Sequence, residues 1–402
     1  MRTKHAGFGA FFALCGVAGL ASCGEGAPRA ADSATAAELP STPGLSAVAA
    51  LGERLFRDES LSASGRLACQ SCHRPEFAHA APASDLVSKG GPDMDLPGLR
   101  NSPSIRYASF TPAFRFDADG AAVGGFFRDG RAASLVEQAK MPFTDPREMA
   151  NAAPGDVIAR LGRSPNAARF RAVFGKDALD DPAAAFDRLA AAIAQFEVEN
   201  PDFHRFDSKY DAWLAGRAEL TPAERRGLAL FEDAKKGNCA ACHPSRRGED
   251  GSPPLFTDFT YDAVGVPRNP RIAANADPAF HDLGLCGPER RDLAARRDLC
   301  GAFKVPTLRN VARTAPYFHN GAFERLEDVV AFYARRDTDP GEWYPTGAAG
   351  VLKFDDLPPG LAGSVNTGEV PYDRKPGDEP ALTPAEVDDI VAFLKSLDDG
   401  YN

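Results

Sequence analysis

The chain has 402 residues, a length that predicts two domains, and it carries 46 lysine and arginine residues against 56 aspartate and glutamate residues. With 25% charged and 44% hydrophobic residues, the composition is that of a globular protein and excludes a collagen-like, coiled-coil or wholly disordered chain. The formal net charge of −10 gives no electrostatic reason to bind nucleic acid. Eight cysteines are the unusual feature, since thiols can form disulfides, bind zinc or carry haem.

The first 22 residues have the pattern of an export signal. A basic start precedes an apolar stretch from Phe8 to Leu20, which is too short to span a bilayer stably. The sequence Leu-Ala-Ser-Cys at 20–23 resembles a bacterial lipobox, in which the cysteine becomes the acylated first residue of the mature chain. We expect a periplasmic protein anchored to the outer membrane by a lipid on Cys23. The alternative is a plain secretory signal cut within the alanine-rich run 27–37.

The rest of the chain repeats one order of motifs. Leu-Gly-Glu-Arg-Leu-Phe at 51–56 precedes Cys-Gln-Ser-Cys-His at 69–73, and Gly-Leu-Ala-Leu-Phe at 227–231 precedes Cys-Ala-Ala-Cys-His at 239–243. An apolar helical face therefore leads into the same pentapeptide pattern in each half.

Helix-start signals place the boundary between the halves. Thr-Pro-Ala-Glu occurs at 221–224 and at 383–386 and matches a capping box, and Asp181-Pro182 begins a further amphipathic pattern. No strand-like alternation is sustained, so the class is mainly α. We expect a tether over 23–45, an N-terminal domain over 46–218 and a C-terminal domain over 219–402.

The two Cys-x-x-Cys-His motifs indicate two covalently bound c-type haems. The two thiols of each motif can add to the vinyl groups of one haem; they belong to Cys69 and Cys72 in the first motif and to Cys239 and Cys242 in the second. The adjoining histidine, His73 or His243, can then ligate the iron. The alternatives are a four-cysteine zinc site or two redox disulfides, but zinc ribbons pair their cysteines at closer spacing and neither alternative requires the histidines. The export signal agrees with this interpretation, because c-type haem is attached outside the cytoplasm. We therefore expect two cytochrome c-like domains in tandem.

The sequence resembles the bacterial di-haem cytochrome c peroxidases and their MauG-like relatives over roughly residues 46–398. Two motifs that carry the resemblance precede the first haem site: Leu-Gly-Glu-Arg-Leu-Phe at 51–56 and Leu-Ser-Ala-Ser-Gly at 61–65. The others follow it: Arg-Asn-Ser-Pro at 100–103, Asp-Gly-Arg-Ala-Ala-Ser-Leu at 129–135, Phe-Lys-Val-Pro-Thr-Leu-Arg-Asn at 303–310 and Pro-Tyr-Phe-His-Asn-Gly at 316–321. The resemblance implies that the haem on His73 reacts with hydrogen peroxide and that the haem on His243 passes or stores electrons.

The resemblance also predicts the distal side of the first haem. Peroxidases of this family close the resting haem with a loop histidine, but residues 80–100 contain none and have Lys89 near the matching place, so an open haem is expected. His79 is expected to be a surface or supporting residue rather than a ligand. The family's acid–base glutamate matches Glu148, with Gln138 placed to orient peroxide; an exposed carboxylate at a helix start is the alternative for Glu148.

Two further positions differ from the peroxidase pattern. Where peroxidases ligate the second iron with methionine and MauG-like proteins with tyrosine, this chain has Tyr333. A phenolate should lower the potential of the His243 haem, although Tyr333 could instead be a core aromatic residue. Arg128 stands where relatives have a tryptophan between the haems, and an arginine is not readily oxidised, so the route of electron transfer between the haems is open.

The resemblance implies a calcium ion between the haems, held by the Asn101 side chain and the carbonyls of Thr314 and Pro316. Cys286 and Cys300 are expected to form a disulfide in an exported protein, closing a loop of about 15 residues. The remaining histidines are expected to be structural: His204, His281 and His319.

The sequence thus predicts a periplasmic di-haem enzyme that reduces hydrogen peroxide with electrons from a cytochrome c or a cupredoxin. A MauG-like enzyme that oxidises residues of a protein substrate is the alternative, and it shares nearly all the motifs. A non-catalytic electron-transfer cytochrome is a third possibility, which Glu148 and an open first haem argue against. The only expected membrane contact is the lipid anchor.

Overall fold

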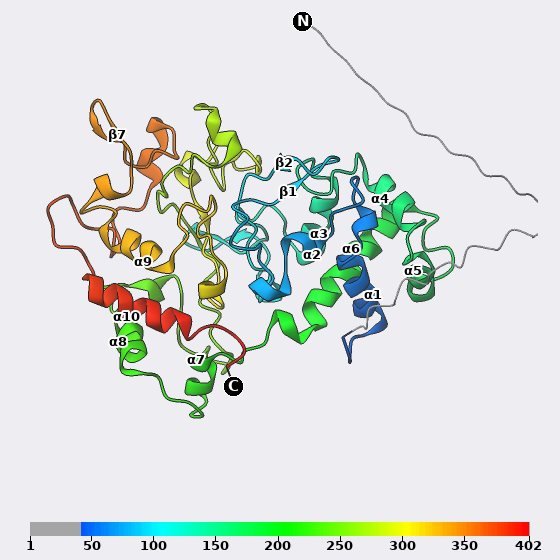
Figure 1. Cartoon of the computed structure of the whole chain (residues 1–402), viewed down its shortest axis with the longest axis horizontal. Coiled ribbons are helices and arrows are strands. Elements are labelled where there is room, and N and C mark those ends of the chain that lie inside the picture. Colours follow the sequence, from blue (N-terminus) through cyan, green and yellow to red (C-terminus); the bar gives the residue numbers. More distant parts are fainter. Residues whose placement is uncertain (1–41, 402) are drawn as a thin grey trace, which may run out of the picture. The chain divides into compact units, whose positions relative to one another are not determined.

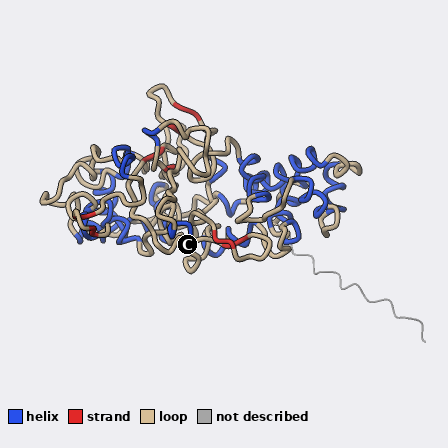
Figure 2. The backbone as a smooth tube through the Cα atoms, turned by 90° about the horizontal axis from the view of Figure 1, so that it is seen from above, coloured by secondary structure: helices blue, strands red, loops and turns tan. Residues whose placement is uncertain are grey.

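Short helices and long connecting loops make up most of the chain, as Figure 2 shows. The computed structural model describes residues 42–401, and these belong to one compact unit. The signal segment 1–22, Cys23 and nearly all of the tether 23–45 lie outside the described residues. Within residues 42–401, no helix combines the length and apolar character needed to cross a membrane.

The α-helices fall into an N-terminal and a C-terminal group (Figure 1). The N-terminal group consists of α1 (Ala47–Phe56), α2 (Cys69–Cys72), α3 (Leu135–Thr144), α4 (Pro154–Leu161), α5 (Ala167–Phe174) and α6 (Pro182–Glu199). The C-terminal group consists of α7 (Lys209–Leu214), α8 (Pro222–Glu232), α9 (Leu326–Arg335) and α10 (Pro384–Lys395). The expected helix-rich class is confirmed.

The strands of the described residues are two residues long and pair antiparallel, in four separate ribbons. The pairs are β1 (Lys89–Gly90) with β2 (Leu96–Pro97), β3 (Arg115–Phe116) with β4 (Ala122–Val123), β5 (Tyr261–Asp262) with β6 (Phe303–Lys304), and β7 (Thr346–Gly347) with β8 (Gly350–Val351). These ribbons pin loops in place and do not form a layer of the fold.

Capping residues fix where the principal helices begin. The Thr221 hydroxyl accepts a hydrogen bond from the Glu224 N–H at 3.3 Å, and the Glu224 carboxylate accepts one from the Thr221 N–H at 2.7 Å. Thr383 and Glu386 form the same reciprocal pair at α10, and Asp181 caps α6. Each cap satisfies N–H groups that have no partner inside the helix, so the predicted starts are confirmed.

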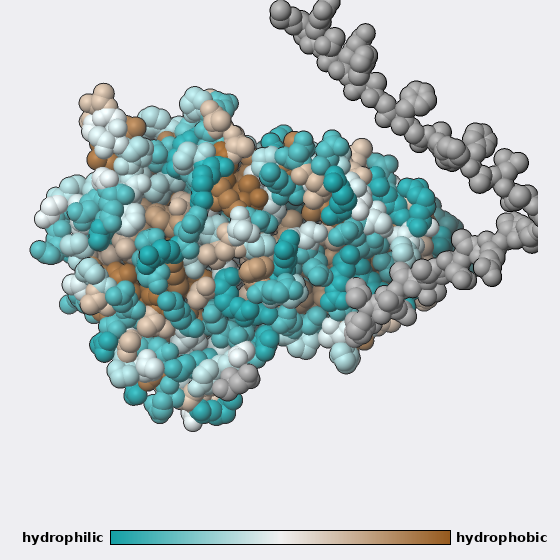
Figure 3. All heavy atoms as spheres, viewed as in Figure 1, coloured by the Kyte–Doolittle hydropathy of each residue, from teal (hydrophilic) through white to brown (hydrophobic). Residues whose placement is uncertain are grey.

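Each half has its own large apolar cluster. The N-terminal cluster packs α1, α3 and α4 around α6, with α5 against α1, and the C-terminal cluster packs α8 and α9 against α10. Apolar positions predicted for α6 and α10, including Phe186, Leu189, Val387 and Ile390, are all buried. Hydrophilic residues cover most of the face in Figure 3, and apolar residues show there in a few patches.

The same close helix crossing occurs in both halves. In α1, a methyl group on Gly52 would overlap the Ala192 carbonyl oxygen of α6 and lie 2.9 Å from the Phe196 Cβ. In α8, a methyl group on Gly227 would overlap the Asp389 carbonyl oxygen of α10 and lie 2.9 Å from the Phe393 Cβ. In each half, the glycine thus lets the backbones of the two crossing helices come into contact. The repeat seen in the sequence therefore extends to the helix packing.

Replacement of Gly227 by alanine is expected to lower the free energy of unfolding by about 1–3 kcal/mol, because α8 and α10 must separate to admit the methyl group. Urea denaturation of the haem-loaded protein measures the change. Gly155→Ala in α4 is the matched control, since nothing lies within 4 Å of its added methyl group and it should be neutral or slightly stabilising. Equal stability of the two variants would contradict the packing account.

Buried ion pairs join the halves. Arg100 donates to Asp282 at 2.6 and 2.8 Å and to Asp129 at 2.7 Å. Arg106 donates to Asp202 at 2.7 Å and to Asp399 at 3.3 Å. Because both arginines have nearly all of their surface buried and each pairs with two carboxylates, loss of either arginine would leave buried carboxylates uncompensated, which is strongly destabilising.

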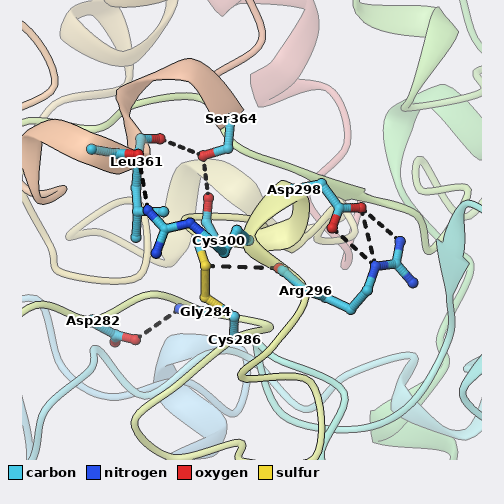
Figure 4. The surroundings of a disulfide bond; sticks show 10 residues. Asp282, Gly284, Cys286, Arg296, Asp298, Cys300, Leu361 and Ser364 are labelled. Atoms are coloured by element: carbon cyan, nitrogen blue, oxygen red, sulfur yellow. Dashed lines mark hydrogen bonds and ion pairs between the residues drawn. A yellow bond between two sulfur atoms is a disulfide. The ribbon is translucent and has the colours of Figure 1, made fainter.

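Cys286 and Cys300 form a disulfide with Cα atoms 5.1 Å apart (Figure 4). The Ser364 hydroxyl donates to the Cys300 carbonyl at 2.6 Å, which fixes one end of the loop that the disulfide closes. At the other end, Arg290 donates to the Asp129 carbonyl at 3.0 Å and lies over the Phe114 ring. The closed loop therefore packs a C-terminal segment against the N-terminal half.

Replacement of both cysteines by alanine is expected to lower the free energy of unfolding by about 3 kcal/mol, the chain-entropy estimate for a loop of this length. Urea denaturation with and without a reductant tests this. The reduced wild-type protein should approach the Cys286→Ala/Cys300→Ala variant, while the variant should not respond to the reductant. An unchanged midpoint in the variant would show that the disulfide does not stabilise the fold.

Candidate functional site: two linked cavities

The first motif lines a cavity of about 340 Å³. The Cys72 and His73 side chains face it, and α2 begins at the neighbouring Cys69. His73 Nδ1 lies 3.1 Å from the His79 carbonyl oxygen, so Nδ1–H donates there and Nε2 remains available for a metal. Burial lowers the pKa of His73 to about 4, which keeps the imidazole neutral, the form that ligates iron.

The second motif lines a separate cavity of about 220 Å³. Cys239, Cys242 and His243 face this space, and His243 Nδ1 lies 2.8 Å from the Phe256 carbonyl oxygen. Burial lowers the pKa of His243 as well. Each half thus holds a neutral imidazole by the same type of backbone hydrogen bond.

The cysteine arrangement fits haem better than the alternatives. The four motif cysteines are free thiols rather than disulfides; Cys72 faces the first cavity, and Cys239 and Cys242 face the second. Within residues 42–401, no group of three or more histidine, cysteine or acidic side chains is placed to hold a metal ion. A zinc site shared by the two motifs would need such a group. Each motif instead supplies two thiols beside one neutral imidazole, the set required to attach and ligate one haem.

Helix α3 and the turn after it bring Gln138, Pro142 and Glu148 to the first cavity. Ser134 caps the start of α3, and the helix ends before Asp145-Pro146, where the proline disfavours helical backbone for the preceding residue. The β1–β2 hairpin then fixes the turn, since the Gly91 N–H donates to the Glu148 carbonyl oxygen at 2.9 Å. Glu148 is thereby held at the cavity wall, half-buried rather than exposed.

Desolvation raises the pKa of Glu148 to about 7, and the negative charges of Asp145 and Glu289 act in the same direction, while Arg131 opposes them. A carboxyl group with this pKa can both accept and return a proton at neutral pH. Glu289 also lines the cavity, and sequence reasoning missed it. It lies in the disulfide loop, 141 residues from Glu148, and no local pattern connects the two.

His73 is the only histidine that lines the first cavity in the described part of the chain. His79, the nearby candidate, is buried behind His73 and does not line the cavity; its Nε2 lies 2.7 Å from Asp202 and its ring stacks on Phe203. The expectation of a supporting residue therefore holds, but His79 is not at the surface. Lys89 lines the cavity with an exposed side chain.

Tyr333 faces the second cavity together with His243, whereas the adjacent Phe332 is fully buried in an apolar cluster. The core position on α9 is thus taken by Phe332, which leaves Tyr333 available as a ligand. Burial raises the pKa of the Tyr333 hydroxyl, with neighbouring negative charges adding to the effect. An iron would therefore have to displace the proton to bind the phenolate. Tyr372, which sequence reasoning also missed, lines the same cavity, and its ring centre lies 5.7 Å from that of Tyr333.

The two cavities share a wall. The side chains that line both are Arg128, Lys304, Val305, Pro306, Leu308, Val311, Tyr317 and Phe318. Arg128 occupies the place expected for it, between the cavities. Lys304 donates to the Gly125 carbonyl oxygen and makes no ion pair with a carboxylate among the described residues. These two cations could pair with the carboxylate groups that haem carries.

The residues expected to hold calcium do not fit that ion. Asn101, Thr314 and Pro316 all line the first cavity. However, the Asn101 backbone and side-chain oxygens accept hydrogen bonds from Arg128, at 3.1 and 3.0 Å. A guanidinium therefore lies at the position where the ion would need those oxygens.

Comparison with known proteins agrees with this geometry. The family described as "Di-haem cytochrome c peroxidase" matches residues 46–219. The chain is 36% identical to the methylamine utilization protein MauG of Paracoccus denitrificans over 375 residues, 89% of this chain and 90% of that protein. It is 33% identical to the cytochrome c551 peroxidase of Nitrosomonas europaea over 299 residues, 73% of this chain and 75% of that protein.

Among solved structures, the chain is similar to the diheme peroxidase BthA from Burkholderia thailandensis, with a TM-score of 0.80 and 40% identity. The match covers 91% of this chain and 88% of that one. Matches of this extent, together with two cavities that each hold one Cys-x-x-Cys-His motif, imply two haems and an oxidoreductase of the peroxidase type. The chain belongs to the di-haem cytochrome c peroxidase and MauG family.

Proposed function

We propose that the protein reduces hydrogen peroxide at the first cavity. The observation that carries the proposal is the placing of Glu148 and His73 in one cavity that contains no second histidine in the described residues. Two c-type haems, attached through Cys69 with Cys72 and through Cys239 with Cys242, would supply the iron that takes up oxidising equivalents. Tandem cytochrome c-like domains, 46–218 and 219–402, would each hold one of them.

The chain's own residues bind peroxide and move its proton. Gln138 can donate a hydrogen bond from its amide to a peroxide oxygen, which orients the molecule. Ionised Glu148 accepts a proton from the oxygen nearer the iron and returns it to the departing oxygen, which leaves as water. The positive charge of Arg131 in the same cavity favours the ionised form of Glu148 before peroxide arrives.

The second cavity serves as the electron site. Ligation by His243 and Tyr333 would favour oxidised iron, because an anionic oxygen donor stabilises higher oxidation states. The shared wall puts the two sites next to each other, so that electrons taken up at one can reach the other. A site used only for electron transfer would need neither Glu148 nor Gln138 in the first cavity.

The electron source is proposed to be a small redox protein, a cytochrome c or a cupredoxin. A specific feature favours the MauG-like alternative, oxidation of residues in a protein substrate: Tyr333 faces the second cavity, while the methionines of the described residues, Met94, Met141 and Met149, do not line it. We also propose that the protein is exported to the periplasm and anchored to the outer membrane by a lipid on Cys23. This part of the proposal rests on the leader sequence alone.

Steady-state turnover of the haem-loaded protein tests the donor. Reduced cytochrome c, or a reduced cupredoxin, is mixed with hydrogen peroxide and oxidation of the donor is followed by absorbance. Oxidation of about two donor molecules per peroxide, dependent on the enzyme, would support the peroxidase, since peroxide reduction to water takes two electrons. Fast consumption of one equivalent of peroxide without donor oxidation would favour a protein substrate.

A further inference from the structure

Arg128 holds the centre of the wall between the two cavities. Its side chain lines both of them, and its backbone carbonyl accepts a hydrogen bond from the Lys304 N–H at 2.8 Å. Strand β6, which contains Lys304, thus fixes the backbone from which the guanidinium projects.

The guanidinium makes a fork of two hydrogen bonds to one residue. Arg128 Nε donates to the Asn101 backbone oxygen at 3.1 Å, and Nη2 donates to the Asn101 Oδ1 at 3.0 Å. The orientation of the amide is set from the other side, because Asn101 Nδ2 donates to the Leu86 carbonyl oxygen at 3.4 Å. The Asn101 N–H also donates to the His319 carbonyl oxygen at 2.8 Å. Both Asn101 oxygens are therefore held toward Arg128.

In the described part of the chain, the carboxylates whose charges act on Arg128 and Lys304 are Asp282 and Asp129, and both already pair with other arginines. Both Asp282 oxygens accept from Arg100, and Asp129 accepts from Arg100 and Arg131. Arg128 adds a charge of its own, since an arginine guanidinium is always protonated at neutral pH. A calcium ion needs six to eight oxygen ligands, and a divalent cation beside an unneutralised guanidinium would meet strong repulsion.

We propose that the Arg128 guanidinium takes the place of a calcium ion between the two cavities, so that this protein binds no calcium there. One side chain then supplies both the positive charge and the hydrogen bonds that hold Asn101. The wall is built into the chain and does not depend on the calcium concentration outside the cell.

Metal analysis of the haem-loaded protein tests the proposal. The protein is treated with a chelator, dialysed against about 1 mM CaCl₂, a concentration that fills extracellular calcium sites, and separated from free ions before elemental analysis. Because each haem-loaded chain carries two irons, the iron content gives the number of chains in the sample. Wild-type protein is expected to hold less than about 0.1 calcium per two irons, and about one calcium per two irons would overturn the proposal by itself.

Two variants test whether the guanidinium is what excludes the ion. Arg128→Ala removes the charge and the donors, and Arg128→Gln removes the charge but keeps an N–H donor. Either variant is expected to bind calcium at least tenfold more tightly than wild type in isothermal titration calorimetry. Arg115→Ala, at an exposed position in β3, is the matched control and should behave as wild type. Haem-loaded Arg128 variants that still bind no calcium would overturn the assignment to Arg128.

Discussion

Glu148→Gln is expected to slow the reaction of the ferric protein with hydrogen peroxide by roughly 10²–10⁴-fold, the usual contribution of a positioned acid–base group. Glutamine keeps the size of the side chain and its place against the β1–β2 hairpin, but it cannot accept the proton of peroxide. Stopped-flow absorbance at the haem Soret band measures the rate. The free energy of unfolding should change little, because the Glu148 side chain makes no ion pair in the described residues.

Glu249→Gln, at an exposed turn, is the matched control and should react as wild type. The pH dependence gives a second test. Because the pKa of Glu148 is raised to about 7, the carboxyl is protonated below that pH, and the rate with peroxide should fall as the pH drops below 7. In Glu148→Gln this fall should disappear. A glutamine variant that keeps the wild-type rate and pH profile would remove Glu148 from the reaction.

Tyr333→Phe is expected to change the spectrum of the second haem alone and to raise its reduction potential by on the order of 100 mV, within the roughly 0.8 V range that axial ligands span. The phenol oxygen is lost while the ring that packs between Phe318 and Tyr372 remains. Spectroelectrochemical titration, with electron paramagnetic resonance of each ferric haem, measures both quantities.

Tyr344→Phe is the matched control for this change. Tyr344 is also a buried tyrosine, but its hydroxyl donates to the Gly265 carbonyl oxygen and it does not line the second cavity. Its loss should cost stability without moving either potential. If both tyrosine variants leave the second haem unchanged, Tyr333 is not a ligand.

Local patterns predicted a large part of the fold. The capping boxes at Thr221 and Thr383 could be found because a helix start is decided by residues within one turn. The apolar faces of α6 and α10 followed from their period. The two Cys-x-x-Cys-His motifs likewise contain the thiols and the imidazole within five residues, so each cavity could be expected before its walls were known.

The walls of the site could not be predicted in this way. Glu289 reaches the first cavity on the disulfide loop, and its approach to Glu148 depends on tertiary packing alone. The sequence showed that Arg128 stands in an unusual place, but it could not show that the guanidinium takes both oxygens of Asn101. His79 was expected to be a surface or supporting residue, and only the structure shows that it is buried against Phe203 and supports His73 through its backbone carbonyl.

The central claim is that peroxide reacts at the first cavity with the help of Glu148. It is tested most directly by mixing the ferric, haem-loaded protein with one equivalent of hydrogen peroxide in a stopped-flow spectrometer. We expect the Soret absorption to change at a rate proportional to peroxide concentration in the wild type, and far more slowly in Glu148→Gln. A ferric spectrum that does not respond to peroxide, with both haems low-spin and six-coordinate, would contradict the account and would identify an electron-transfer protein instead.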